Sequence, residues 1–440
     1  MEPEPTTEPE PTTEPETEEG VPPASATESL PEAAGTMRSD AAYEDYVKYG
    51  ISAKGLRHVV TEFAIDAATS TSQLCQTAIK PHTAPPGWTD EPQLIVTDES
   101  GNDVSANHWY THSYVRQETG ERQAGPPDGT RSMCELLEAD RSTAHFVAKP
   151  THFLSHAWSF LLLNLLLAVE DFVANLPEGE PEPFFWFDCF SLDQHAQSGQ
   201  GSDWWRDTFF KAIGAIGHTV MVLSPWDNPL PLTRAWCLWE LYCTHKAGKP
   251  FSVCLGPLER RAFEEAILKD FDVVFEAFAR IDVAHASAAR KSDQDRIRQA
   301  VAEEVGFTQL NAIAFEQIRA WVFRVAQQIA TDAEEGPSGL RKKHMIAILF
   351  EKFGMTEKAK PLYQEVIDGE CKHYGESHPS TLVTKGNYAE LLRGEGTAES
   401  LALAKPLYQE VIDGQCKHYG ESHPETLRSK GNYAELLRGE

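Results

Sequence analysis

The chain has 440 residues, 41% of them hydrophobic, and a formal net charge of −28. It is long enough for two or three domains. Nucleic acid and anionic membranes are disfavoured as partners, because their phosphates repel an acidic surface. Residues 1–40 carry −10 of this charge, with ten Glu and one Asp against one Arg. They contain many prolines and no aromatic residue, which predicts a disordered acidic tail and excludes an ordinary signal peptide.

Residues 41–150 predict a mixed N-terminal extension that packs on the domain that follows it. QLIVTD (93–98) has the pattern of a short strand, and SMCELLEAD (132–140) has that of a helix. Paired prolines punctuate the region and mark its loops.

Residues 151–256 alternate short apolar runs with helical patterns. The runs lie in THFLSHAW, FFWFDCF, HTVMVLS and KPFSVCLG, and the helical patterns cover 159–176 and 204–217. This order predicts a doubly wound α/β domain of the flavodoxin-like kind, built on a parallel sheet. FLLLNLLLAV (160–169) spans ten residues, whereas a membrane helix needs about 20, so we expect a buried helix.

Polar and aromatic residues follow the predicted strands, and open sheets of this type bind ligands beyond the carboxyl ends of their strands. The residues expected there are Ser155, His156, Trp158, Asp188, Asp193, Ser224 and Trp226. A less favoured alternative is a zinc site of His152, His156, Cys189 and His195, whose spacings match no zinc signature. The eight cysteines include no C-x-x-C pair, which favours reduced, mostly buried thiols in a cytoplasmic protein.

The strand ends also carry a family resemblance. FLSHAW, FWFDCFSL and RAWCLWEL (234–241) resemble the first strand, the second strand and the "WCL.EL" segment of plant Toll/interleukin-receptor (TIR) domains. The enzymatic members of that family imply cleavage of the nicotinamide–ribose bond of NAD, which would be a substrate and not a bound cofactor. The Glu of the family segment falls on Glu240, which the resemblance makes the catalytic residue.

A carboxylate beside the ribose can stabilise the oxocarbenium-like centre that forms in such a reaction. Trp236 lies one helical turn before Glu240 and could line the pocket, and Arg234 is the best-placed partner for a phosphate. The alternative is that these residues have structural roles only. Glu240 would then be a solvated or ion-paired surface residue, the tryptophans core residues and His156 a packed strand-end residue. This chain has Ala157-Trp158 where the plant members have Arg-Gly.

Residues 257–335 predict a helical segment. Apolar residues recur at helical spacing over 258–281, 293–305 and 307–331. Periodicity does not decide whether FDVVF (271–275) is part of a helix or a fifth strand.

Residues 338–440 contain a duplication. The 37 residues from Ala359 and those from Ala404 differ at four positions, with an offset of 45, whereas an earlier segment aligns at an offset of 42. Two helices per period predict a tetratricopeptide-type solenoid, and the layout resembles kinesin light chain repeats. We expect the array to be incomplete at its C-terminal end, and Pro361 and Pro406 to lie in the first turns of their helices or to kink them.

Three functions are consistent with these patterns. The first is a cytosolic signalling protein that hydrolyses NAD and binds proteins through its repeats. The second is a non-enzymatic scaffold whose TIR-like domain self-associates. The third, a kinesin-light-chain-like cargo adaptor, is disfavoured because no heptad coiled coil precedes the repeats.

Overall fold

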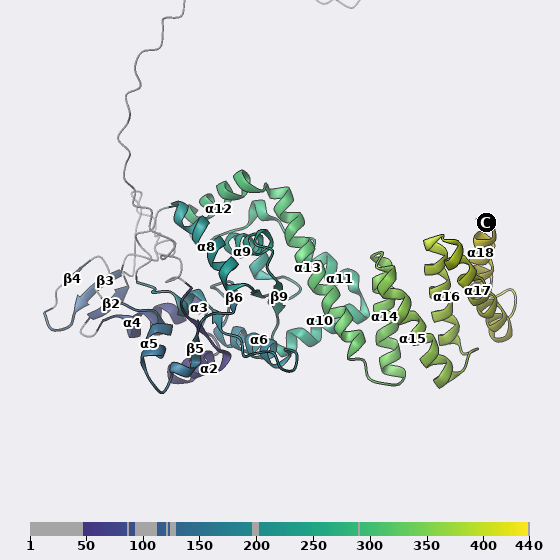
Figure 1. The fold of residues 1–440 in the computed structure, drawn as a ribbon, viewed down its shortest axis with the longest axis horizontal. Helices are drawn as coiled ribbons and strands as arrows, with labels where there is room; N and C mark the ends of the chain where they lie inside the picture. Colours follow the sequence, from purple (N-terminus) through teal and green to yellow (C-terminus); the bar gives the residue numbers. More distant parts are fainter. Residues whose placement is uncertain are drawn as a thin grey trace, which may run out of the picture. The chain divides into compact units, whose positions relative to one another are not determined.

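The structure is a computed structural model (Figure 1) that describes residues 47–85, 88–92, 112–119, 122–123, 129–195, 202–288 and 291–438. The predicted acidic tail and the predicted strand at 93–98 lie outside the described residues.

A six-stranded mixed sheet has the order β5-β1-β7-β6-β8-β9. Its strands are β1 Gly50–Ile51, β5 Val147–Ala148, β6 His152–Ser155, β7 Phe185–Trp186, β8 Thr219–Val222 and β9 Phe251–Cys254. Strands β7, β6, β8 and β9 pair in parallel, whereas β1 is antiparallel to both β5 and β7. The four parallel strands thus form the parallel sheet that the alternation of strands and helices predicted. Two short strands from the N-terminal extension, β1 and β5, add to its β7 edge.

The parallel strands are buried on both faces, because their side chains alternate between two cores. Phe153, Met221 and Val253 lie in one core, together with residues of helices α8 and α9. Leu154 and Val220 lie in the other core, together with residues of α2 and α6. The bounds of these helices are α2 Ala53–Glu62, α6 Leu162–Ala174, α8 Ser202–Ile216 and α9 Ala235–Lys246. The predicted buried helix at 160–169 is therefore confirmed as α6.

A small antiparallel sheet and further helices complete the N-terminal and middle regions. They are β2 Trp88–Pro92, β3 His112–Arg116, β4 Arg122–Gln123, α3 Thr71–Leu74, α4 Lys80–Thr83, α5 Met133–Ala139, α7 Asp188–Ser191, α10 Pro257–Lys269, α11 Phe271–Phe278, α12 Lys291–Glu304 and α13 Phe307–Thr331. The segment FDVVF lies in α11 and not in a strand. The Asp270 side chain caps this helix by accepting a hydrogen bond from the Asp272 N–H.

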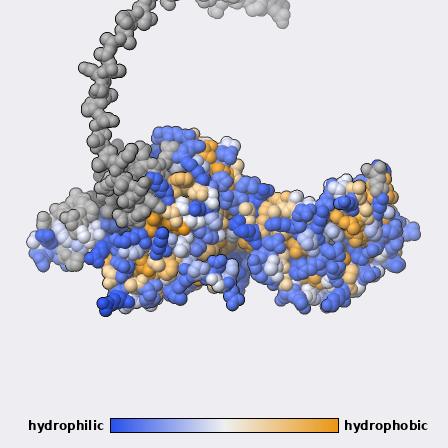
Figure 2. Space-filling view, in the orientation of Figure 1, coloured by the Kyte–Doolittle hydropathy of each residue, from blue (hydrophilic) through white to orange (hydrophobic). Residues whose placement is uncertain are grey.

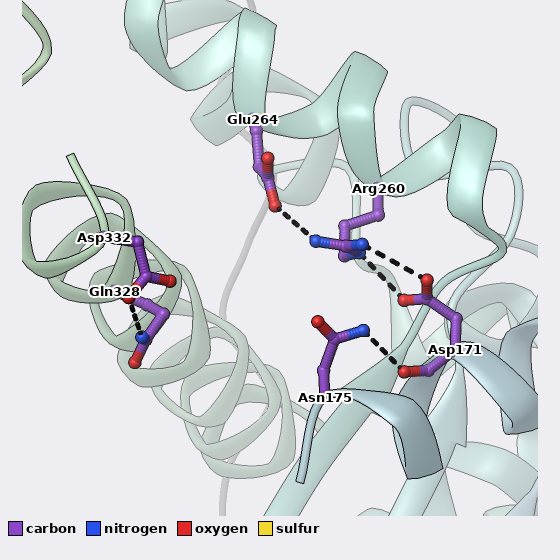
Figure 3. A network of polar contacts seen from close by, with 6 residues as sticks. All are labelled: Asp171, Asn175, Arg260, Glu264, Gln328 and Asp332. Carbon is purple, nitrogen blue, oxygen red and sulfur yellow. Dashed lines mark hydrogen bonds and ion pairs between the residues drawn. The ribbon is translucent and has the colours of Figure 1, made fainter. Parts of the chain in front are cut away.

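An arginine joins α10 to the helix layer of the sheet (Figure 3). Arg260 donates from Nε and Nη2 to the two carboxylate oxygens of Asp171 on α6, at 2.8 and 3.2 Å, and from Nη1 to Glu264. Such two-pronged contacts fix orientation as well as distance. Arg260 thus positions the first helix after the sheet.

The remaining helices form a tetratricopeptide-like array in which successive helices contact each other (Figure 1). They are α14 Pro337–Lys352, α15 Thr356–Tyr374, α16 Pro379–Glu395, α17 Ala398–Tyr419 and α18 Pro424–Arg438. The repeated HYGESHP sequence makes the turn after α15. Gly375 ends that helix with φ at +99°, and the His378 ring caps α16 by accepting from the Ser380 N–H. Pro379 then occupies the first helical position, where no N–H is needed.

The two offsets of the repeat have a simple structural origin. Helix α17 has 22 residues and α15 has 19, so the second copy is longer by three residues at its N-terminal end. Because α15 begins at Thr356 and α17 at Ala398, Pro361 and Pro406 lie in the interior of these helices and not in the first turn, which corrects that part of the expectation. Each proline leaves the carbonyl four residues earlier without its helical donor.

Glycines in α15 and α17 allow close approach of the preceding helix. A Cβ built on Gly369 would lie 2.5 Å from a Leu340 methyl, and one on Gly414 would lie 2.6 Å from both Leu382 methyls. Leucine side chains on α14 and α16 therefore fill the space that a side chain at these glycines would need.

We expect Gly414→Ala to lower the free energy of unfolding by about 1–3 kcal/mol, because the new methyl overpacks against Leu382. Gly431→Ala is the matched control, since Gly431 is also helical but has no atom within 4 Å of its built Cβ. There the substitution should instead add about 0.5–1 kcal/mol through helix propensity. Chemical denaturation of both variants measures the difference, and equal effects would contradict the packing argument.

Candidate functional site

The site is centred on a hydrogen bond between the first parallel strand and helix α9. Ser155 ends β6 and, two residues after Phe153, points to the same face of the sheet. Its Oγ donates to Glu240 Oε2 at 2.6 Å. Ser155 is buried and Glu240 is partly buried. The contact lies at the carboxyl end of β6, next to β8, where the strand order reverses and ligands of such sheets bind.

Burial raises the pKa of Glu240 from 4.5 to about 8. The hydrogen bond from Ser155 opposes this shift, and the negative charge of Asp188 adds to it. The carboxyl group is thus largely protonated at neutral pH and ionises in the mildly alkaline range. A carboxyl group with a pKa near the working pH suits acid–base chemistry, and such shifts are frequent at functional sites.

Asp188 and Trp158 form a second pair in the same region. Trp158 Nε1 donates to Asp188 Oδ2 at 2.7 Å, and Asp188 Oδ1 accepts from the Cys189 N–H at 2.7 Å. Asp188 lies in the first turn of α7, where a carboxylate is favoured by the helix dipole. Ser155, Trp158 and Asp188, which the strand-end argument nominated, therefore lie together with Glu240, which the family resemblance nominated.

His156, which follows Ser155 in the chain, is buried. Its ring lies edge-on to Phe187 with centroids 4.7 Å apart, and burial lowers its pKa. Its Nε2 has no hydrogen-bond partner among the described residues. Cys237 is close to the site but was not among the residues predicted there. Its Sγ lies 3.3 Å from the His156 carbonyl oxygen, and its place three residues before Glu240 was the available signal.

The other predicted residues make different contacts. The Trp226 N–H donates to Glu259, and the ring lies against Phe263 on α10. The ring centroids of Trp236 and Phe209 lie 5.4 Å apart, which favours a packing role for Trp236. Arg234 immediately precedes α9, with Nη1 3.5 Å from Ser287 Oγ. Ser224 is buried and lies two residues after β8.

The residues of the alternative zinc site contact separate partners. His195 bonds to Thr83 at 2.8 Å, the Cys189 thiol lies 4.0 Å from the Thr71 carbonyl oxygen, and His152 bonds to Thr151. Asp193 accepts from the Thr130 hydroxyl at 2.6 Å. Within the described part of the chain, no group of three or more His, Cys, Asp or Glu side chains is placed to hold a metal ion.

All eight cysteines are free thiols, and six of them are buried.

Of the helices in the described ranges, none combines the length and apolar character that crossing a membrane requires.

No protein-family model and no curated protein matches the chain. Solved structures similar to it include two that are described as kinesin light chain nearly identical TPR-like repeats from Podosopora anserina. They are 19% and 20% identical, cover 41% of this chain and 85% of their own, and superimpose with a TM-score of 0.27. At that TM-score the repeat assignment rests on the helix contacts described above, and the resemblance to TIR domains stays a prediction.

Proposed function

We propose that this protein is a scaffold whose repeat array binds protein partners. The observation that carries the proposal is the regular stacking of α14 to α18, in which each helix contacts the next. Arrays of this kind expose extended surfaces that are used for binding.

Affinity capture with mass spectrometry tests this role by comparing three forms of the protein. These are the full chain, a chain that ends at Gly336, and Gly414→Leu, which separates α17 from α16. Partners that bind through the array should be lost from both altered forms. Partners gained only by the shortened chain would bind the apolar surface that the truncation exposes. Retention of the same partners by all three forms would contradict the proposal.

We propose a second function for the α/β region, the hydrolysis of NAD at the nicotinamide–ribose bond. The observation that favours it is the partly buried Glu240 carboxyl group beside the switch point of the sheet, with its raised pKa. Nicotinamide would leave with the electron pair of the broken bond, and positive charge would develop on the ribose. The ionised carboxylate would stabilise that charge, and water would add to the ribose carbon and lose a proton.

Purified protein incubated with NAD should therefore release free nicotinamide at a rate that rises with pH. Because the active form is the carboxylate, kcat/KM should increase about tenfold per pH unit below about 8 and level off above it. A rate that falls between pH 6 and 8 would contradict the role given to Glu240. Absence of release at any pH would favour the non-enzymatic alternative, in which the α/β region self-associates.

A further inference from the structure

Two junctions in the repeat array use the same contacts. Where α14 meets α15, Leu340 lies against Gly369 and Lys343 pairs with Glu365. Where α16 meets α17, Leu382 lies against Gly414 and Lys385 pairs with Glu410 at 2.6 Å. The first-helix residues are 42 apart and the second-helix residues 45 apart, so the contacts are equivalent.

A tyrosine completes each junction. Tyr363 Oη donates to Glu351, and Tyr408 Oη donates to Glu390 at 2.7 Å. The two tyrosines are equivalent, whereas the two glutamates occupy different positions of their helices. In both second helices the three contacting residues have the same spacing, with the glutamate two and the glycine six residues after the tyrosine. Helices α15 and α17 thus share the pattern Tyr-x-Glu-x-x-x-Gly.

Helix α18 carries the same contact residues that α16 contributes to its junction with α17. Its Leu427, Lys430 and Glu435 correspond to Leu382, Lys385 and Glu390 at an offset of 45. Leu382 is 2% exposed under α17, whereas Leu427 is 53% exposed. Leu392 and its counterpart Leu437 show the same contrast, 1% against 49%.

Apolar surface is visible at the α18 end of the array in Figure 2. An exposed face that duplicates a buried one is complementary to the same kind of helix.

We propose that the outer face of α18 is a docking surface for an amphipathic helix with the pattern Tyr-x-Glu-x-x-x-Gly. The glycine makes room for Leu427, the glutamate pairs with Lys430, and the tyrosine donates to Glu435. The proposal rests on the protein-binding role of the array and names the chemistry of one partner.

The test appends a copy of residues 396–420 after Glu440 of the full chain. This copy carries the pattern and preserves the spacing between α16 and α17. Amide exchange across 424–438 should slow by about tenfold or more, because local opening now has to break the new junction. Lys430→Glu should reverse much of this protection, and a copy carrying Glu410→Lys should restore it.

A copy carrying Gly414→Leu is the decisive variant, because the new side chain collides with Leu427. The matched control is a copy carrying Gln409→Leu, which adds the same side chain at an exposed position. Protection lost in the first and kept in the second supports the proposal. Unchanged exchange with the intact copy, or equal protection by both altered copies, would overturn it. Neither result depends on the partners captured by the unextended chain, so failure here is separable from failure of the scaffold role.

Discussion

Glu240→Gln should lower NAD turnover by about 10²–10³-fold, the range expected when one preorganised electrostatic contact to a developing charge is removed. Gln has nearly the same shape and can still accept from the Ser155 hydroxyl, but it cannot become negatively charged. The loss should therefore appear in kcat with the fold intact, and the pH dependence below about 8 should disappear with it. Release of nicotinamide at saturating NAD measures the effect.

The control for this variant is Glu265→Gln, which removes an exposed carboxylate from α10. It changes the net charge by the same amount without touching the site. We expect its turnover to equal that of the parent protein. Equal turnover in Glu240→Gln and the parent would remove Glu240 from the mechanism.

Glu240→Gln should also make the protein more stable above pH 5, by an amount that grows until about pH 8. The pKa of Glu240 is raised from 4.5 to about 8, so the folded state binds its proton more tightly than the unfolded state does. Stability from this group is complete below about pH 4.5 and is lost as the pH rises to 8. At about 1.4 kcal/mol per pKa unit, the loss is at most about 5 kcal/mol.

Gln avoids this loss because it stays neutral at every pH. Urea unfolding of both proteins at pH 5 and pH 8.5 measures the change, and taking the difference cancels the contributions of other titrating groups. If the difference in the free energy of unfolding between variant and parent does not depend on pH, Glu240 is ionised in the folded protein at neutral pH. This test needs no substrate and so stands apart from the NAD hypothesis.

The sequence alone predicted the long helices after the sheet and those of the repeat array, because their signals are local, but it did not predict α2, α3 and α4. The pattern at 307–331 corresponds to α13 at both ends, and the repeat predicted the helix pairs from α14 to α18. Gly375, His378 and Pro379 end α15 and begin α16 through contacts within a few residues of the chain. These helix ends can therefore be predicted from the local sequence. The α18 residues that correspond to buried residues of α16 can also be named from the sequence identity, once the buried residues of α16 are known.

The tertiary structure decided what periodicity leaves open. FDVVF is compatible with a strand or a helix, and the Asp270 cap together with packing on α13 makes it helical. Strand β1 has two residues, too few to show alternation, and it forms only because β5 and β7 offer it partners.

The candidate site likewise has residues that the sequence could identify and contacts that only the tertiary structure determines. The residues that follow β6 and β7 could be identified from the ends of apolar runs, because parallel strands bring their carboxyl ends to one edge. That Ser155 contacts Glu240 and that Trp158 contacts Asp188 depends on how α9 and α7 pack against the sheet, across 85 and 30 residues of chain. The raised pKa of Glu240 depends on the same packing, since its main cause is the water that the surrounding residues exclude.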